Sequence, residues 1–491
     1  MSATAPPSPE VAPAQAGTAP RSSGLAKVVT FVLVFLAVAV SAFSGLSAAT
    51  GSRLTVVLPV VGFLGLLLGA LALTRFSVYV MLMLVIRSSL DLVKLSGGGS
   101  TTTATAATPR ALDPSSLLAV LFLLFAVLWL AAQYRQQGHL PGSPLRRALL
   151  WFAAAAAISV VGSVDPKASA LEWLRIVTIV VMFIVLEQMM VNTATMRQIL
   201  LACFLSTIFP LAFTTVGFLV GHPRSEAKGS FVRITGTFNQ SNNFGRYLMF
   251  MIIFGAALYP YVSRKVRLPL GLMLAISSVF LLLTYTRTAL LGTALGLVIV
   301  GLIQSKRLVL ILMLAGVLAL VAVPQMSARF TDLANTSTPG SGPSGNSLAW
   351  RFTWWGEVLP LANSNPVTGI GLSMTSDLTG VAQPHNDYVR AYVETGLLGL
   401  GTYLAMLIAL VGLGRRAVQA SWRGTFDRGV AAGFLGCAVA YVAASLAANV
   451  MSNVVSLWYL FAFAAAASAV VRRRDLALAR IRNNGAGVLA P

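Results

Sequence analysis

Long apolar runs recur along the chain from Val28 to Val471, and short polar segments separate them. A run of about 20 mostly apolar residues is long enough for a helix to cross the hydrocarbon core of a bilayer. The runs are continuous and rich in Leu, Ala, Val and Gly, whereas a membrane β-barrel needs alternating segments of about ten residues. The pattern therefore predicts an all-α polytopic membrane protein with about 12–14 transmembrane helices.

The spacing of the runs predicts the organisation of the chain. Residues 1–26 are rich in Ala, Pro and Ser and predict a disordered cytoplasmic tail. Transmembrane helices are expected in residues 27–324 and 389–472, with a loop over 325–388 between them and a basic tail over 473–491. The predicted helices begin near Val28, Leu54, Phe76, Ser116, Ala148, Ala168, Ile199, Phe244, Leu268, Thr288, Leu308, Val389, Val430 and Val454.

The Lys and Arg residues concentrate in the connections on one side of the predicted membrane. If the N-terminus is cytoplasmic, the inner connections are all basic, among them SRKVR, QSKR and the C-terminal VRRRDLALARIR. Cytoplasmic connections of membrane proteins carry an excess of Lys and Arg, so both termini are predicted to be cytoplasmic. This topology also accounts for the net charge of +21, and we therefore expect no nucleic-acid partner.

The loop over residues 325–388 is long for a membrane connection, and long loops are often functional. Within it, Ser347–Leu361 has aromatic and apolar residues at helical spacing, followed by a stop rich in Pro and Gly. This pattern predicts an amphipathic helix on the outer face. Arg351 lies on this helix among tryptophans, a setting that is also typical of an interfacial anchor.

Ionisable residues inside apolar runs are costly to bury and are therefore functional candidates. Some are spaced to pair locally, because Arg87 and Asp91 are four residues apart and Glu172 and Arg175 three. Arg246 and Arg287 have no acidic residue at helical spacing. An arginine at the outer end of a span favours an anion, and phosphate matches the planar guanidinium group. The candidates in apolar runs are Arg87, Asp91, Glu172, Arg175, Glu187, Arg246 and Arg287.

Two further polar segments are predicted on the same outer face. In FVRITGTFNQSNNFG, Arg233 precedes several asparagines, whose amides can cap a helix or bind sugar hydroxyls. In PHNDYV, His385 precedes a helix for which Asn386 or Asp387 is the expected N-cap. A histidine beside guanidinium groups is biased toward its neutral form, which can accept a proton. The sequence holds no cluster with metal-ligand spacing and no Gly-rich phosphate loop, so no metal or cofactor is predicted.

Four motifs in this order resemble the O-antigen ligase family, which includes O-antigen polymerases and some protein O-oligosaccharyltransferases. They are GTFNQSNNFGRYL, TYTRTALLG, WRFTWWGEVLPLANSNPVTGIGL, and His385-Asn386 followed by Gly396 and Gly399. The resemblance spans about Thr235 to Leu400. It implies a GT-C-like fold and a metal-independent inverting glycosyltransferase on the outer face of the bacterial cytoplasmic membrane, acting in surface polysaccharide biosynthesis.

The resemblance also implies roles for individual residues. The donor would be a glycan on undecaprenyl diphosphate, held by Arg287 and Arg351, and His385 would orient or deprotonate the hydroxyl of a glycan or lipid acceptor. Glu394 would orient a neighbouring arginine. The residues expected to bind substrate are Arg233, Asn239, Asn243, Arg246, Asn386 and Glu394.

Three functions remain open at this point. A ligase transfers a finished glycan to a new acceptor, and a polymerase extends a lipid-linked repeat unit from the same donor. A transporter of lipid-linked sugars would instead place polar residues near the middle of the bilayer and often shows internal repeats. The polar candidates here gather at one face and no repeat is visible, which favours an enzyme.

Overall fold

The computed structural model describes residues 65–93, 114–228, 231–305, 307, 347–379 and 383–486. The chain divides into two compact units, Met1–Tyr79 and Val80–Pro491. The described part of the first unit holds the short helix Gly65–Thr74 and the start of α3 (Phe76–Arg87). The helices predicted to begin near Val28, Leu54 and Leu308 lie outside the described residues.

Ten helices within the described ranges are long and apolar enough to cross a membrane, with α7 and α8 counted as one span. Each begins within a few residues of a predicted start, so the prediction of an all-α polytopic membrane protein is confirmed. These helices are α4 (Pro114–Gln137), α5 (Pro144–Val161), α6 (Pro166–Met189), α7 (Thr193–Leu205) with α8 (Ile208–Leu219), α9 (Ser241–Leu258), α10 (Arg264–Leu283), α11 (Arg287–Gln304), α16 (Asp387–Ala420), α17 (Phe426–Ser445) and α18 (Val454–Ala486).

Shorter elements join the spans. The helix expected over Ser347–Leu361 is α14, Ser347–Val358, and it gives way to a 3₁₀ turn because Pro360 has no N–H to continue the α-helical ladder. Strands β1 and β2 form an antiparallel hairpin in which Glu226 lies opposite Arg233. The short elements are η1 (Leu90–Val93), β1 (Ser225–Lys228), β2 (Phe231–Ile234), η2 (Tyr259–Tyr261), α14, η3 (Leu359–Ser364) and α15 (Met374–Thr379).

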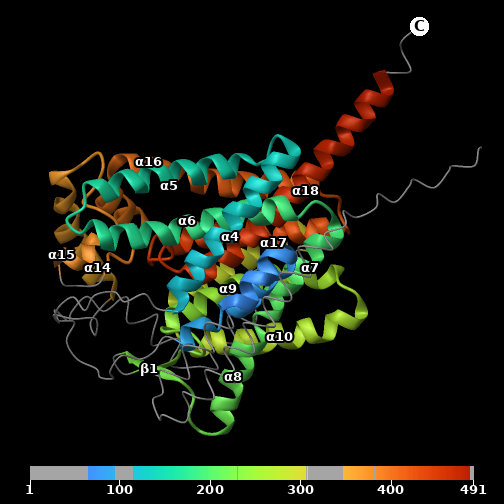
Figure 1. Ribbon diagram of the computed structural model, residues 1–491. Helices are drawn as coiled ribbons and strands as arrows, with labels where there is room; N and C mark the ends of the chain where they lie inside the picture. Colours follow the sequence, from blue (N-terminus) through green and yellow to red (C-terminus); the bar gives the residue numbers. More distant parts are fainter. Residues whose placement is uncertain are drawn as a thin grey trace, which may run out of the picture. The chain divides into compact units, whose positions relative to one another are not determined.

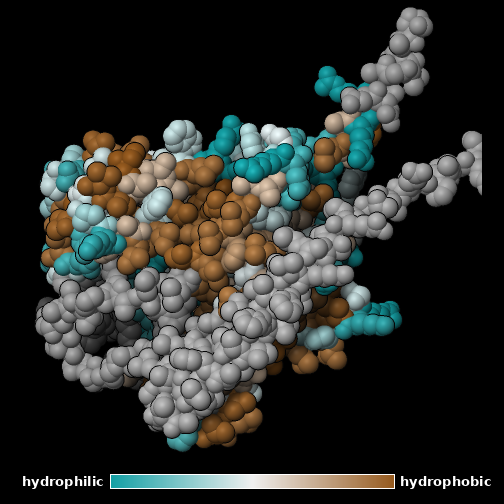
Figure 2. All heavy atoms as spheres, viewed as in Figure 1, coloured by the Kyte–Doolittle hydropathy of each residue, from teal (hydrophilic) through white to brown (hydrophobic). Residues whose placement is uncertain are grey.

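The second unit is built around α18, which contacts α6, α9, α16 and α17. In the most apolar 18-residue stretch of α18, 89% of the residues are buried, whereas the figure for α4 is 11%. A helix that is apolar all round is a buried helix, and the alanines of FAFAAAASAV let neighbouring helices approach closely. The outward faces carry exposed apolar side chains, shown in brown in Figure 2, as expected of a surface in contact with lipid.

Successive spans run in opposite directions, so every second connection reaches the same end of the second unit. Helices α5, α6 and α16 pack together, and α14 and α15 lie at the end where α16 begins (Figure 1). The connection between α5 and α6 reaches this end too, since the Ser169 hydroxyl donates to the Leu372 carbonyl oxygen at 2.9 Å. The candidate site lies at this end.

Candidate functional site

The first turn of α16 sets the position of His385. Asn386 is the N-cap, because its Oδ1 accepts hydrogen bonds from the N–H groups of Tyr388 and Val389 at 2.9 and 3.1 Å. His385 is half-buried, and its φ of 54° is a left-handed conformation that is uncommon outside glycine. Asn386, one of the two predicted caps, is therefore confirmed as the N-cap. Its side-chain oxygen is engaged by the helix, although we also expected Asn386 to bind substrate.

The connection between α17 and α18 lies against this turn. The buried carboxylate of Asp387 accepts hydrogen bonds through Oδ2 from the N–H groups of Val450 and Met451, both at 3.0 Å. The side-chain Nδ2 of Asn449 lies 3.5 Å from Nδ1 of His385, although the two residues are 64 positions apart. One turn of α16 thus holds both the histidine and the loop that faces it.

Arg246 of α9 lies beside the same loop. Its side chain is 5% exposed, and its NH1 donates to the carbonyl oxygen of Asn449 at 3.0 Å. Its Nε is buried and has no hydrogen-bond partner in the described part of the chain. The guanidinium group interacts electrostatically with Asp387, which attracts it, and with Arg351, which repels it.

Arg351 is brought to the site by α14. One turn further along this helix, the indole Nε1 of Trp355 donates to the carbonyl oxygen of Pro384 at 2.7 Å, directly before His385. The Nε of Arg351 is buried and has no hydrogen-bond partner among the described residues. Burial lowers the pKa of this guanidinium group, because a charge is less stable away from water. Two cations, one buried and one half-buried, therefore lie at the His385 end of α16, each with a buried and unused Nε donor.

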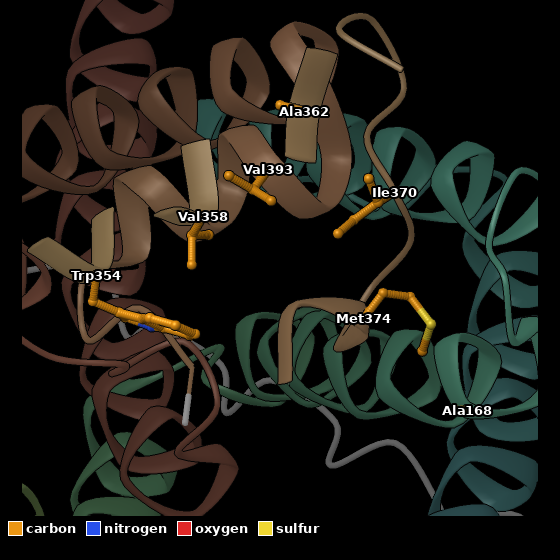
Figure 3. Packing of buried hydrophobic residues seen from close by; sticks show 7 residues of the cluster. All are labelled: Ala168, Trp354, Val358, Ala362, Ile370, Met374 and Val393. Atoms are coloured by element: carbon orange, nitrogen blue, oxygen red, sulfur yellow. The ribbon is translucent and has the colours of Figure 1, made fainter. Parts of the chain in front are cut away.

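An apolar cluster holds α14 in place. Figure 3 shows side chains from α6, α14, η3, α15 and α16 around one centre. Trp354 is 6% exposed, so it is a core residue that packs α14 against the rest of this cluster. Burying one such large side chain contributes about 1.5–3 kcal/mol. The buried members are Ala168, Trp354, Val358, Ala362, Ile370, Met374 and Val393.

A second buried arginine, Arg390, has charged partners. Its Nε donates to Glu394 at 2.9 Å and its NH2 donates to Glu172 of α6 at 3.1 Å. Its NH1 donates to the hydroxyl of Ser452, which in turn donates to Oε1 of Gln383 at 3.2 Å. The expected role of Glu394 in orienting an arginine thus has a structural counterpart, and the network ties α6, α16 and the α17–α18 connection together.

The P-x-x-G-x-G motif has a structural role at a break in α16. Gly396 has φ 66° and ψ −168°, which interrupts the helix. The loop fills the gap in the backbone ladder: the carbonyl oxygens of Val393 and Glu394 accept from Ile370 and Gly371 at 3.1 Å each. The N–H group of Leu397 donates to the Pro366 carbonyl oxygen at 2.9 Å, and that of Leu398 to the Val367 carbonyl oxygen at 3.2 Å. Backbone groups left unpaired by the break are therefore satisfied by the loop, as a membrane segment requires.

Glycine is required where loop and helix approach most closely. A Cβ on Gly369, whose φ is 75°, would lie 2.4 Å from the backbone of Glu394. A Cβ on Gly396 would lie 2.2 Å from the backbone of Val367. Both distances are shorter than any side chain tolerates, so these glycines permit the contact that positions Glu394.

Arg233 holds the β-hairpin against the turn between α10 and α11. Its Nε donates to the Thr284 carbonyl oxygen at 2.7 Å, and its NH2 donates to Asn242 at 2.6 Å and to Thr286 at 2.9 Å. Glu226 lies 3.8 Å away on the opposite strand. With four partners and 2% exposure, this guanidinium group is engaged within the protein.

The other predicted site residues surround this turn. Arg287 is the first residue of α11, directly after Thr286, and is half-buried. Asn243 is half-buried, and its carbonyl oxygen accepts from Asn453 at 3.5 Å, while Asn239 is exposed. Asn242 and Arg246 are four residues apart on α9, so one helix face joins the turn of Arg287 to the loop of Asn449.

The remaining charges of the apolar runs have partners. Glu172 pairs with Arg175 at 2.8 Å, as the spacing predicted, and also with Arg390. Glu187 pairs with Arg146 at 2.7 Å at the other end of the helices. The guanidinium carbon of Arg87 lies 5.6 Å from the centroid of the Trp458 ring.

Sequence reasoning did not single out Arg390 or Asn449. Arg390 had a signal in the sequence, because it lies four residues before Glu394, a spacing at which helical residues can pair. Asn449 had none, because it is an amide in a short connection and meets His385 only in the folded chain.

Comparison with known proteins supports the interpretation of these motifs. No curated protein matches the chain. The sequence model of the O-antigen ligase family matches residues 272–404. The matched range contains Arg287, Arg351 and His385, whereas the GTFNQSNNFGRYL segment and Asn449 lie outside it. The predicted resemblance is confirmed over this range: the chain is a multi-pass membrane protein in which residues 272–404 are similar to the O-antigen ligase family.

Proposed function

We propose that this protein transfers a glycan from undecaprenyl diphosphate to an acceptor hydroxyl at the outer face of the bacterial cytoplasmic membrane. One observation carries the proposal: Arg246 and Arg351 interact electrostatically beside the His385 loop, and each has a buried Nε without a hydrogen-bond partner in the described residues. Two neighbouring cations with unused donors favour an anion between them. The diphosphate of a lipid-linked donor has that charge.

The arginines would act on the leaving group. As the bond between the anomeric carbon and the phosphate oxygen breaks, the electron pair stays on the oxygen and the diphosphate gains negative charge. Fixed guanidinium groups stabilise this charge more in the transition state than in the bound donor, which lowers the barrier. Arg351, Arg246 and Arg287 are the proposed donors of these hydrogen bonds, and no metal ion takes part in the proposed step.

His385 would act on the acceptor. The acceptor oxygen attacks the anomeric carbon on the side opposite the leaving diphosphate, so the configuration of that carbon is inverted. The hydroxyl proton passes to the imidazole, which accepts it in its neutral form. The products are the transferred glycan and undecaprenyl diphosphate.

The proposed orientation follows from the charges at the two ends of the helices. The ends remote from His385 carry most of the basic residues, including Arg146, Arg147, Arg264, Lys265, Arg267, Arg415, Arg416, Arg472, Arg473 and Arg474. Such excess is typical of the cytoplasmic side. We therefore propose that both termini are cytoplasmic and that His385 faces the outside.

The test is glycan transfer in cells lacking the native protein and complemented with single variants at matched membrane levels. His385→Ala, Arg287→Ala and Arg351→Ala are each expected to abolish transfer and to let lipid-linked donor accumulate. The matched control is His139→Ala, because His139 lies in the α4–α5 connection and contacts only the Gln137 carbonyl oxygen there, at 3.1 Å. Normal transfer by all three site variants would overturn the proposal and favour a transporter.

The product distinguishes the two enzymatic functions. A ligase yields one finished chain on a new acceptor, and a polymerase yields a ladder of repeat units on the carrier lipid. Both use the same donor chemistry, so the variants above are expected to lose either product.

A further inference from the structure

The loop between α17 and α18 contacts the site along its whole length. The Asn449 carbonyl accepts from Arg246, and the next two N–H groups are held by Asp387 at 3.0 Å each. Ser452 accepts from Arg390. Asn453 then caps α18, because its Oδ1 accepts from the N–H of Ser456 at 3.3 Å. The loop is therefore fixed to α9 and α16 before any substrate binds.

This anchoring fixes the distance between Asn449 and His385. Asp387 is two residues after His385, and it holds the N–H group of Val450, directly after Asn449. The side chains of His385 and Asn449 are therefore linked through only a few residues: two along α16 to Asp387, the hydrogen bond to Val450, and one residue back to Asn449. The 3.5 Å between Asn449 Nδ2 and His385 Nδ1 is a consequence of this ring of contacts.

The carboxamide has one unused atom. Its nitrogen faces Nδ1 of His385, while its Oδ1 is buried and has no hydrogen-bond partner in the described residues. The two ends of a carboxamide have nearly the same shape, so a half-turn of the side chain exchanges them without moving the backbone. Either a donor or an acceptor can therefore be presented to the ring.

The chemistry of the ring selects between these orientations. A neutral imidazole carries its proton on one nitrogen only, and the hydrogen bond made by one nitrogen determines which it is. To take a proton from an acceptor hydroxyl through Nε2, the ring must carry its own proton on Nδ1. That N–H needs an acceptor, and the carboxamide oxygen of Asn449 is within a half-turn of it.

We propose that Asn449 is a positioning residue for His385, and that its Oδ1 accepts a hydrogen bond from Nδ1–H and so leaves Nε2 unprotonated to act as the base. The inference rests on the proposed function of His385 in transfer. It adds a residue outside the matched range of the family and assigns each ring nitrogen a role.

The first test needs no activity. The chain has three histidines, so His139→Gln with His222→Gln leaves His385 as the only one. With ¹⁵N-labelled histidine in the full chain, nitrogen chemical shifts report which ring nitrogen carries the proton. We expect a protonated Nδ1 and an unprotonated Nε2, and a loss of this preference in Asn449→Leu. A protonated Nε2 in the otherwise native chain would overturn the inference.

The second test is the pH dependence of transfer, measured as undecaprenyl diphosphate released by the purified full chain from lipid-linked glycan extracted from cells lacking the protein. Asn449→Leu is expected to slow release about 10- to 100-fold, the size of effect seen when a partner that orients a histidine is lost. Asn449→Asp keeps an acceptor for Nδ1–H and adds charge that stabilises the imidazolium. We expect it to retain activity, with the acidic limb of the profile moved to higher pH.

The charged groups around the ring define the control. Asp387 of α16, two residues after His385, interacts electrostatically with Arg390 of α16 and Arg246 of α9, and Arg246 interacts with Arg351 of α14, whereas the sequence from Ser445 to Val454 has no charged residue. Asn453→Asp adds the same charge to the same loop and keeps a good helix cap, because Oδ1 of Asn453 accepts from the N–H of Ser456 at 3.3 Å. Its acidic limb is expected to stay in place.

The outcomes separate the inference from the proposed function. If Asn449→Asp is as slow as Asn449→Leu, or if Asn453→Asp moves the limb equally, the role of Asn449 is refuted while the function of His385 stands. If His385→Ala transfers normally, the proposed function fails and the base role fails with it.

Discussion

Two of the arginines that are buried at this end of the helices, Arg390 and Arg246, have different surroundings. Arg390 is fully buried and donates to two carboxylates, of Glu172 and Glu394, and to a hydroxyl. Arg246 is nearly as buried, but its hydrogen bond to a backbone carbonyl leaves Nε without a partner in the described residues. A buried cation is tolerated when its charge is compensated. Arg390 is compensated by the chain, whereas Arg246 has room for an anion from outside.

The difference teaches which buried charges build the fold and which are available for chemistry. The carboxylates of the Arg390 network come from α6 and α16, so the network joins elements that must pack in any state of the protein. Arg246 instead interacts electrostatically with a second cation, Arg351, which repels it. Repulsion between the two is relieved when an anion binds.

Removing Arg390 should have the largest effect on stability. Arg390→Met removes the cation that pairs with buried Glu394 and leaves Glu172 with Arg175 alone, and losing one partner of a buried pair costs about 3–5 kcal/mol. Thermal unfolding of the detergent-solubilised chain is expected to begin at a much lower temperature, and transfer should fall with it. Adding Glu172→Gln and Glu394→Gln to the same chain should restore most of the stability, and an unchanged unfolding temperature for Arg390→Met alone would contradict this role.

Removing Arg246 should break function and spare the fold. Arg246→Met is expected to reduce transfer about 100- to 1,000-fold, the effect of losing one donor to a developing negative charge. Its unfolding temperature should be unchanged or higher, because a buried cation short of partners is removed. If Arg246→Met lowers the unfolding temperature as much as Arg390→Met, the contrast between the two arginines is wrong.

The break in α16 at Gly396 positions Glu394, which is one of the two carboxylates that compensate Arg390. Gly396→Ala places a Cβ against Val367 and forces a left-handed residue, with an expected loss of about 1–3 kcal/mol in the free energy of unfolding. Gly401→Ala is the matched control on the same helix, since a Cβ there meets no atom within 4 Å. That control should be neutral or stabilising by up to about 1 kcal/mol, and equal losses in both variants would refute the role of the break.

The smallest effect is expected where α14 meets the His385 loop. Trp355→Phe keeps the ring but loses the hydrogen bond to Pro384, which is worth about 0.5–1.5 kcal/mol. Release of undecaprenyl diphosphate should slow by less than about tenfold, because Arg351 is held less firmly. Trp422→Phe, at an 81% exposed position between α16 and α17, should leave the rate unchanged.

Local patterns in the sequence were enough for much of the fold. The apolar runs predicted the starts of all ten spans found in the described residues, because bilayer thickness sets the length of a membrane helix. The Asn386 cap and the Glu172–Arg175 pair are contacts within a turn, and both were predicted. The motifs from about Thr235 to Leu400 also indicated a resemblance to the O-antigen ligase family, and the sequence model of that family matches residues 272–404.

Contacts between distant segments could not be predicted in the same way. The span beginning near Val389 was expected to be continuous, and its break at Gly396 is stabilised by backbone bonds from a loop about thirty residues earlier. Arg233 had the residue type of a substrate ligand, yet its partners on α9 and before α11 engage it within the protein.

The sequence by itself determined where the described spans begin, offered Asn386 as a helix cap directly after His385 and indicated the resemblance to the O-antigen ligase family, because each depends on a run or motif of neighbouring residues. Only the tertiary structure decided which buried arginine is compensated, which helix carries Arg351 to His385, and that Asn449 faces the imidazole. The reason is physical. A charge or an amide acquires its role from the groups within a few ångströms, and in this chain those groups come from α6, α9, α14, α16 and the α17–α18 loop.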